Sequence, residues 1–449
     1  MKALHLVVVA VLLLPAVGAG PAPGGDASVP ASQPSGGTVA PAARSTGAES
    51  VPSPTRRRSV ADAPAGIDRV EQVDHTPRPP GTVNALGVRS NVSNRSGFGT
   101  AYVDLGPALG VESAAASHRL RTIRAVRRVQ SADGHAERTR RLRTELRTIE
   151  RRTDALGGTQ RDVLSAYVAD RLTAEELLVD LAELDHEARS LDDRRRRLWT
   201  IANRTGASVD DDRFRALGRE LDAYDGPVRA QVTAVLTGEA DAGRFYVSTT
   251  PRGVVIATLT DDAYLREAYR GDLRRVGNGP INGSTAADVV AGDYPGVWQA
   301  RQEVDAEGGR IARVRVEYLG GRLTTLIGSG NRRVFVDEHR RSLALAGSNT
   351  TAVNTRDGLR MTINRSYAGG PMRLELRDTD GNRVNASVTV GPAGGRSVTV
   401  GHTGSDGRLW MLTPHQRFTI VAIHGQSVVF LTMDPLSTPD PGTKATGGS

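Results

Sequence analysis

Few residues in this sequence have the types and spacing that catalysis requires. The nine His are scattered, and no two share a helix face at the spacing of metal ligands. The sequence contains neither a Gly-X-Ser-X-Gly nucleophile elbow nor a Walker-type phosphate loop. His402 and His415 flank an expected strand, and folding can bring them close to each other. We therefore expect no enzyme activity, no metal and no cofactor.

One segment has part of the pattern of a calcium-binding loop. Asp378, Asp380 and Asn382 have the first three ligand spacings of such a loop. The sixth position is Arg383 instead of Gly, and the twelfth is Thr389 instead of Glu. A tight hairpin turn explains the segment better, because Asp-Gly is a preferred turn pair.

Clusters of like charge lie on an expected long helix. Glu175-Glu176 and Asp192-Asp193 have the appearance of the paired carboxylates used in acid–base catalysis. On an exposed helix face, however, carboxylates pair more readily with Arg. The run from Arg194 to Arg197 covers a full turn, so its members cannot all face one side. We interpret the run as a solvated basic helix end, with a contact to an anionic partner as the alternative.

The most frequent chemical signal is a modification motif. Seven of the twelve Asn begin an Asn-X-Ser/Thr sequon, which is more than chance predicts from the Ser and Thr content. This enrichment predicts an exported glycoprotein. The predicted acceptors are Asn91, Asn94, Asn203, Asn282, Asn349, Asn364 and Asn385.

The amino-terminal sequence predicts export. Lys2 precedes an apolar run that ends at Pro15, and small residues follow, so residues 1–20 are expected to be a signal peptide. The apolar run is short for a membrane span, and an uncleaved anchor is the alternative. We expect a secreted or cell-surface protein with no transmembrane span in the mature chain.

Two segments of low apolar content follow the signal peptide. Residues 21–66 are rich in Pro, Gly, Ser and Ala and are expected to be a disordered linker. Residues 67–111 contain several Pro and are expected to be extended or loosely ordered. The chain has no Cys, which excludes disulfides, thiolate metal sites and a lipidated Cys.

The net charge of +8 raises the possibility of nucleic-acid binding. Residues 112–152, however, carry 12 Arg against 5 acidic residues, whereas residues 153–193 carry 3 Arg against 11 acidic residues. A basic helical arm is thus followed by an acidic one, and antiparallel packing would neutralise both. We therefore expect no nucleic-acid partner and an unknown protein partner at the cell surface.

The fold class expected from these patterns is multidomain α+β. Residues 112–238 are expected to form an antiparallel helical bundle or hairpin, whose first helix carries the apolar residues Leu120, Ile123, Val126 and Val129. Gly157-Gly158 predicts the end of the second helix. The longest helix is expected over residues 174–201, where apolar residues recur at steps of three and four behind a capping-box pattern.

The remaining chain is expected to form two smaller domains and a tail. Residues 243–340 predict a small α+β domain, with a hairpin around Pro251 and a short helix or loop over residues 261–272. Residues 349–435 contain seven short strand patterns with turn pairs between them and predict an Ig-like β-sandwich. Residues 436–449 are polar and are expected to be a disordered tail.

Two stretches resemble known domain families. The sandwich pattern is similar to the carboxypeptidase-regulatory-like or Ig-like domain, which implies a non-catalytic appendage of an exported protein; it is carried by Asp378, Gly381, Val384, Ala386, Val388, Val390, Asp406, Gly407, Trp410 and Phe418. Residues 287–336 are similar to a PepSY-type unit, in which a helix precedes three strands; the strand positions are Val314, Val316, Tyr318, Leu323, Val334 and Val336.

The whole layout resembles a family of exported haloarchaeal proteins of unknown function. The shared features are the Arg-rich helical region, the Tyr264–Tyr269 segment, the sequence around Asn364 and the Trp410 sandwich. The resemblance implies no activity. We expect a non-enzymatic interaction or structural protein, and the alternative is a regulatory or inhibitory factor for an exported protease or other envelope enzyme.

Overall fold

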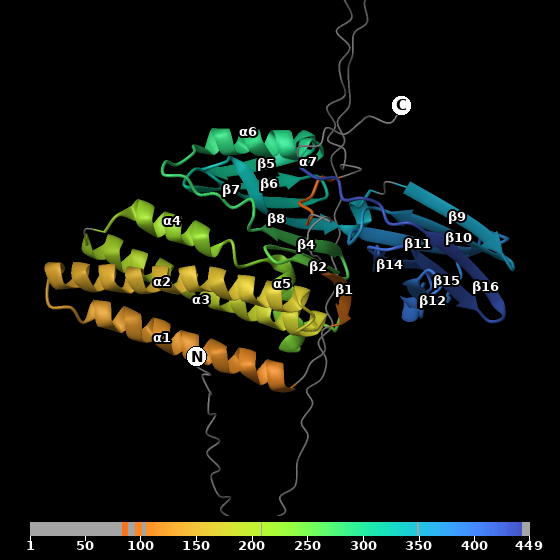
Figure 1. Ribbon diagram of the computed structural model, residues 1–449, viewed down its shortest axis with the longest axis horizontal. Helices are drawn as coiled ribbons and strands as arrows, with labels where there is room; N and C mark the ends of the chain where they lie inside the picture. The colour runs from red at the N-terminus through yellow and green to blue at the C-terminus, as the bar shows by residue number, and fades with distance from the viewer. Residues whose placement is uncertain (1–82, 89–94, 101–104, 208, 348–349, 442–449) are drawn as a thin grey trace, which may run out of the picture. The chain divides into compact units, whose positions relative to one another are not determined.

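The computed structural model describes residues 83–88, 95–100, 105–207, 209–347 and 350–441 (Figure 1). The predictions made for the signal peptide and linker, and for Asn91, Asn94 and Asn349, lie outside these residues. The helices in the described residues are α1 (Leu105–Gln130), α2 (His135–Val168), α3 (Ala174–Thr205), α4 (Asp211–Leu221), α5 (Pro227–Leu236), α6 (Gly283–Asp293) and α7 (Pro295–Gln299), with a 3₁₀ turn at Leu343–Leu345.

The expected long helix is α3, and its start follows from its sequence. The Thr173 side chain accepts a hydrogen bond from the Glu176 amide, and the Glu176 side chain accepts one from the Thr173 amide. This reciprocal pair satisfies two amides that the first turn would otherwise leave unpaired. Gly206 ends the helix with φ 61°, a left-handed conformation that costs Gly little. The predicted apolar seam is buried along its length, at Leu177, Leu181, Leu184, Ala188, Leu191 and Leu198.

The first two helices differ from their predictions. Helix α1 begins at Leu105, before the expected start. Of its expected apolar residues Val129 is buried, whereas Leu120 and Ile123 are 54% and 41% exposed. Helix α2 does not end at Gly157-Gly158 but continues to Val168. Two interior Gly cost a helix about 1 kcal/mol each, but tertiary packing overrides this local preference at Gly157.

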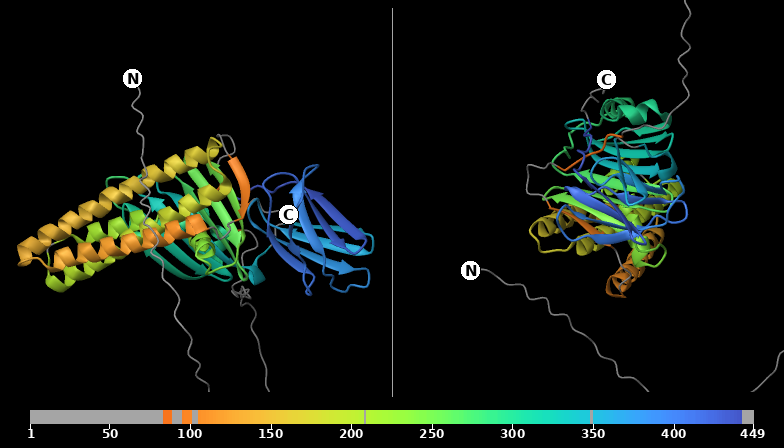
Figure 2. Two further views of the ribbon diagram at one scale, coloured as in Figure 1. Left: turned by 90° about the horizontal axis from the view of Figure 1, so that it is seen from below. Right: turned by 90° about the vertical axis from the view of Figure 1, so that its right-hand side faces the viewer.

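Eight antiparallel strands form one sheet with helices on both faces (Figures 1 and 2). Helices α6 and α7 cover one face, and α2 to α5 lie on the other. The order across the sheet is β1-β2-β3-β4-β8-β7-β6-β5. The strands are β1 (Arg95–Thr100), β2 (Arg244–Thr250), β3 (Gly253–Leu259), β4 (Ala263–Arg270), β5 (Arg301–Glu307), β6 (Ile311–Tyr318), β7 (Gly321–Gly328) and β8 (Arg333–Ser342).

Strand β4 corrects the prediction of a short helix or loop over residues 261–272. All eight of its residues are buried. A strand covered on both faces does not alternate between apolar and polar residues. In β4 the strand pattern is further obscured by three charged residues, Arg266, Glu267 and Arg270. These side chains are buried, and each forms an ion pair.

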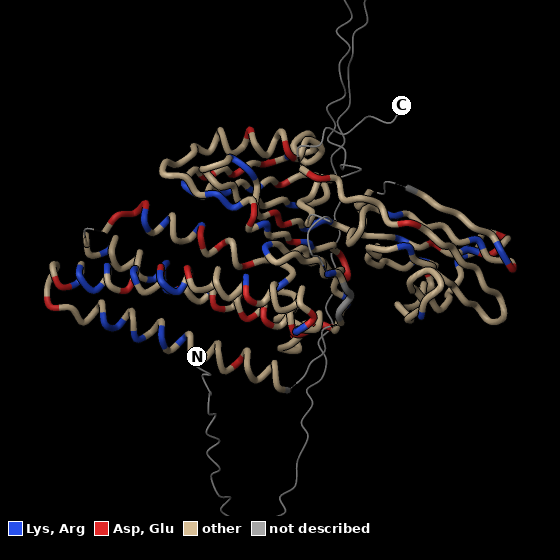
Figure 3. The backbone as a smooth tube through the Cα atoms, viewed as in Figure 1, with Lys and Arg blue, Asp and Glu red and all other residues tan. Residues whose placement is uncertain are grey.

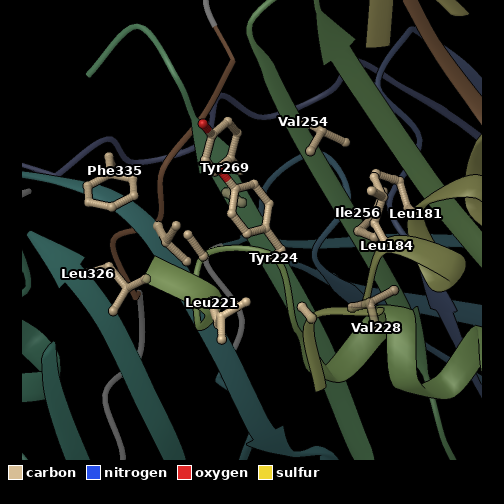
Figure 4. Close-up of a cluster of buried hydrophobic side chains, with 14 of the residues drawn as sticks. Leu181, Leu184, Leu221, Tyr224, Val228, Val254, Ile256, Tyr269, Leu326 and Phe335 are labelled. Carbon is tan, nitrogen blue, oxygen red and sulfur yellow. The ribbon is translucent and has the colours of Figure 1, made fainter. Parts of the chain in front are cut away.

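One hydrophobic core joins the helices to the sheet. Leucines of α3 and α4 meet branched side chains of β3 and rings of β4 and β8 (Figure 4). The shared core means that the predicted helical and α+β segments bury apolar surface against each other. The labelled members in Figure 4 are Leu181, Leu184, Leu221, Tyr224, Val228, Val254, Ile256, Tyr269, Leu326 and Phe335.

The carboxy-terminal domain is strand-rich, as predicted, and has its own core. It contains two four-stranded antiparallel sheets, ordered β14-β11-β10-β9 and β13-β12-β15-β16. Gly381 and Gly407 have φ of 86° and 64° in the predicted turns. The strands are β9 (Thr350–Arg356), β10 (Leu359–Arg365), β11 (Pro371–Asp378), β12 (Ser387–Pro392), β13 (Val398–His402), β14 (Arg408–Leu412), β15 (Phe418–His424) and β16 (Ser427–Met433).

An extended segment at residues 83–88 is fixed to the sheet by charged side chains. The Leu86 amide donates to Asp337 Oδ2 at 2.6 Å, and the Leu86 carbonyl accepts from Arg266. The same segment binds the expected disordered tail, because the Ala85 amide donates to the Pro439 carbonyl at 2.9 Å and the Asn84 side chain donates to the Asp440 carbonyl at 3.1 Å. The prediction of disorder is therefore wrong for residues 436–441. The segment is thus part of the folded structure although it has no regular secondary structure.

Candidate functional site

A polar cavity of about 270 Å³ lies where α2 and the end of α4 meet the start of β3 and the end of β4. We call it the arginine cavity. It is lined by Thr153, Asp154, Gly157, Arg161, Glu220, Tyr224, Arg252, Tyr269, Gly271 and Arg274.

Three Arg from separate parts of the chain reach this cavity. Arg161 is on α2, Arg252 is in the tight turn between β2 and β3, and Arg274 follows the end of β4. The Gly271 amide donates to the Arg252 carbonyl at 2.7 Å and so fixes the turn beside the end of β4. A Cβ atom at Gly271 would lie 2.9 Å from that carbonyl oxygen, so this close approach requires Gly.

The inner wall of the cavity is aromatic. Tyr224 and Tyr269 lie next to each other in the buried cluster (Figure 4). Arg274 Nη1 donates to the Tyr224 hydroxyl at 2.7 Å, and its guanidinium carbon lies 5.7 Å from the Tyr224 ring centre. This hydrogen bond and the ring contact hold Arg274 in place without a carboxylate. Burial raises the pKa of Tyr224, so its hydroxyl remains protonated at neutral pH.

Gly157 explains why α2 can form the outer wall. A Cβ atom at this position would lie 2.7 Å from the Tyr224 hydroxyl oxygen. The missing side chain therefore lets the helix and the tyrosine approach each other. The sequence pattern contained a true signal at Gly157, but it indicated close packing instead of a helix end.

The two acidic residues of the cavity do not neutralise its Arg by direct pairing. Within the described part of the chain, no carboxylate lies within 4.0 Å of a guanidinium nitrogen of Arg161, Arg252 or Arg274. Arg161 Nε instead donates to the Gly157 carbonyl at 3.1 Å. Burial raises the pKa of Glu220, although the nearby Arg274 opposes this effect. The cavity thus presents more positive than negative charge.

The amino-terminal half of the chain matches the sequence model of one family. The match covers residues 1–241 and is described as a domain of unknown function, DUF7096. The chain belongs to the DUF7096 family. Residues 245–346 match a second family of unknown function, DUF7094, and residues 350–431 match an archaeal fibronectin-III type-like domain. The last match agrees with the predicted Ig-like domain.

No curated protein and no solved structure shows significant similarity to this DUF7096 member. The arginine cavity takes α2 and α4 from the DUF7096 segment and its Arg252, Tyr269 and Arg274 from the DUF7094 segment. The cavity therefore exists only where both segments are folded together. None of the helices in the described residues is both long and apolar enough to cross a bilayer.

Four of the predicted glycosylation acceptors lie in the described residues of this DUF7096 protein. Asn203 is exposed in the last turn of α3, and Asn385 is exposed before β12. Asn282 is exposed at the start of α6, where its Oδ1 accepts from the Thr285 amide at 2.7 Å. Asn364 is only half-exposed on β10, where Thr351 Oγ1 donates to its Oδ1 at 2.7 Å. The first three positions are the more accessible to a modifying enzyme.

The structure places the calcium-like pattern in a hairpin turn. Asp378 Oδ1 accepts from the amides of Asp380 and Asn382 at 2.9 and 2.8 Å. No group of three or more potential metal ligands occurs in the described residues. His402 and His415 are not joined by any hydrogen bond or ring contact there, and His415 instead lies beside the Tyr246 ring.

The charged clusters on α3 have structural partners. Glu176 belongs to the helix cap, and Asp192 pairs with Arg195 and Arg196 at 2.7 and 2.9 Å. The prediction of a solvated basic end over Arg194 to Arg197 is wrong for its first two residues, because Arg194 is buried and Arg195 donates to the Phe214 carbonyl at 3.2 Å. Arg196 and Arg197 are exposed, as predicted. A turn packed between two neighbouring elements buries part of any four-residue run.

A buried polar network lies on the sheet face that α6 and α7 cover, and the sequence analysis did not predict it. Arg266 Nη1 donates to Asp337 Oδ1 at 2.8 Å, and the Tyr294 hydroxyl donates to Asp337 Oδ2 at 3.1 Å. His339 lies 3.2 Å from the same carboxylate oxygen, and all four side chains are buried. The sequence signal of this network is the spacing of Asp337 and His339, which lie two residues apart on β8 and therefore share one face of the sheet. It binds residues 83–88 to the sheet, which is a structural role.

Proposed function

We propose that the protein is exported and acts without catalysis, as an interaction or structural protein at the cell surface. The observation that carries this proposal is the archaeal fibronectin-III type-like domain at residues 350–431. Domains of this sandwich class commonly occur in cell-surface proteins. The resemblance to exported haloarchaeal proteins and the predicted signal peptide support the same proposal.

The sequons add a chemical argument. The described acceptors Asn203, Asn282 and Asn385 are all exposed, as modification requires. In Asn282 only the side-chain oxygen is used by the helix cap, which leaves the amide nitrogen available for a glycan. A glycosylated surface would suit a protein that works outside the cytoplasm.

The decisive experiment is mass spectrometry of the native protein from medium, membrane and cytosol. We expect a chain that begins near Pro21 and carries glycan-sized mass increments. Ser284→Ala removes one sequon but keeps the Asn282 cap, and it should remove one increment. Asn278→Gln alters an exposed Asn outside any sequon and should remove none. An unmodified full-length chain in the cytosol would overturn the proposal.

A second candidate function is regulation of an exported protease or other envelope enzyme. Helices α6 and α7 are followed by the antiparallel strands β5, β6, β7 and β8, and the last three of these contain the strand positions of the PepSY-type unit that residues 287–336 resemble. Purified protein should then lower secreted proteolysis of its host in a dose-dependent assay. Unchanged proteolysis, with no hydrolase co-purifying, would reject this candidate.

A further inference from the structure

Within the described residues, the Arg side chains of the arginine cavity lack the paired carboxylates that most charged side chains of the neighbouring helices have. Around α2, α3 and α4 most charged side chains form ion pairs, including Arg152–Glu187, Arg213–Glu150 and Arg313–Asp222 at 2.6, 2.6 and 3.1 Å. Figure 3 shows this mixture of basic and acidic positions along the helices. In the cavity, by contrast, three Arg converge with no paired carboxylate in the described residues.

We propose that the arginine cavity binds a small oxyanion, in the form of a carboxylate or phosphate group. Arg guanidinium groups recognise both through paired, charge-assisted hydrogen bonds. The exposed side chains of Arg252 and Arg161 supply donors, and Arg274 supplies one that Tyr224 holds in place. This inference does not depend on export or glycosylation.

The tyrosines and acidic residues of the cavity indicate which groups the ligand can carry beside its anion. The hydroxyls of Tyr224 and Tyr269 can donate to an oxyanion or accept from a ligand hydroxyl. Glu220 lies half-buried in the lining, and burial raises its pKa, which weakens its competition for the guanidinium groups. A carboxyl oxygen of Glu220 can accept from a hydroxyl or amino group beside the anion.

The size of the cavity favours a small solute over a polymer. A volume of about 270 Å³ is at the lower end of ligand pockets and accommodates a molecule of a few carbons or an inorganic ion. A nucleic acid or polyanionic chain would instead need a continuous basic track. Along α2 and α3 the ion pairs interrupt such a track.

Isothermal titration calorimetry with inorganic phosphate and, separately, with malonate tests the proposal. Ionic strength is held constant with NaCl. We expect saturable 1:1 binding of at least one probe. Phosphate binding alone would identify a phosphate ligand, and malonate binding alone would identify a carboxylate ligand. If neither probe binds, the proposal is wrong.

A pair of matched variants separates a specific site from general positive charge. R161Q/R252Q removes two exposed cavity Arg, and R147Q/R151Q removes two exposed Arg of α2 outside the cavity. We expect at least tenfold weaker binding for the first variant and less than a twofold change for the second. Equal losses in both variants, or none in R161Q/R252Q, would overturn the assignment. Because the exposed side chains make few contacts, both variants should unfold at the wild-type temperature.

Discussion

Asp225 is half-buried in a group of carboxylates between α3, α5 and the sheet. Asp185, Asp222 and Glu267 act on it as like charges, and Arg189 acts as an opposite charge. Burial is the largest effect, and it raises the pKa of Asp225 to about 7. A carboxyl group with such a pKa is protonated in the fold at a pH where it is ionised in the unfolded chain.

This shift predicts how stability depends on pH. The pKa of an unfolded Asp is about 3.9. The free energy of unfolding therefore keeps its full value below about pH 4 and falls as the pH rises to about 7, where Asp225 must ionise in the fold. Asp225→Asn cannot ionise and should be more stable than the wild type by up to about 4 kcal/mol at pH 8, with little difference at pH 4. Urea unfolding at both pH values measures this. Asp241→Asn, at an exposed loop position, is the control and should change the free energy of unfolding by about 0.5 kcal/mol or less.

Two adjacent glycines of α2, Gly157 and Gly158, allow a test of the close contact between this helix and Tyr224. A Cβ at Gly157 would lie 2.7 Å from the Tyr224 hydroxyl, whereas a Cβ at Gly158 would meet nothing within 4 Å. Gly158→Ala should stabilise the protein by about 0.5–1 kcal/mol through helix propensity. Gly157→Ala should destabilise it by about 1–3 kcal/mol because of overpacking. Denaturant titrations check both, and equal effects would contradict the proposed contact.

Among the secondary-structure elements, α3 depends most directly on local sequence. Its capping box and its buried leucines were both predicted, and both are present. Thr173→Ala removes the side-chain acceptor of the Glu176 amide and should cost about 1 kcal/mol. Thr144→Ala changes an exposed Thr within α2 and should cost about 0.5 kcal/mol or less. Thermal unfolding of the two variants gives the comparison.

Elements with local signals were predictable, and elements set by distant contacts were not. The hairpin of β2 and β3 and the strands around Gly381 follow from alternation and turn chemistry. Strand β4 was missed because its buried charges are balanced by Arg229 and Asp337, which come from other elements. The arginine cavity was also missed, since Arg161, Arg252 and Arg274 converge only after the sheet has formed.

At the scale of the whole molecule, Asp337 connects otherwise separate parts. It binds Arg266 of β4, Tyr294 next to α6, and the Leu86 amide of the extended segment. Asp337→Ala leaves the Arg266 charge buried and unpaired and should destabilise the fold by about 3–5 kcal/mol. Asp262→Ala removes an exposed carboxylate that pairs with Arg340, and it should cost less than about 1 kcal/mol. Guanidinium chloride titrations measure the free energy of unfolding of both variants. Equal losses in the two variants would contradict this role of Asp337.

The pairing of β1 with β2 has a consequence for inheritance. Strand β1 belongs to the DUF7096 segment and β2 begins at the boundary with the DUF7094 segment, yet both lie in one sheet. Neither segment alone can satisfy the backbone groups at this junction or cover the core they share. A gene that lost one half would encode a protein with an open sheet edge, prone to aggregation. We therefore expect the two halves to pass between genomes as a unit, whereas the carboxy-terminal sandwich, with a core of its own, is free to be exchanged.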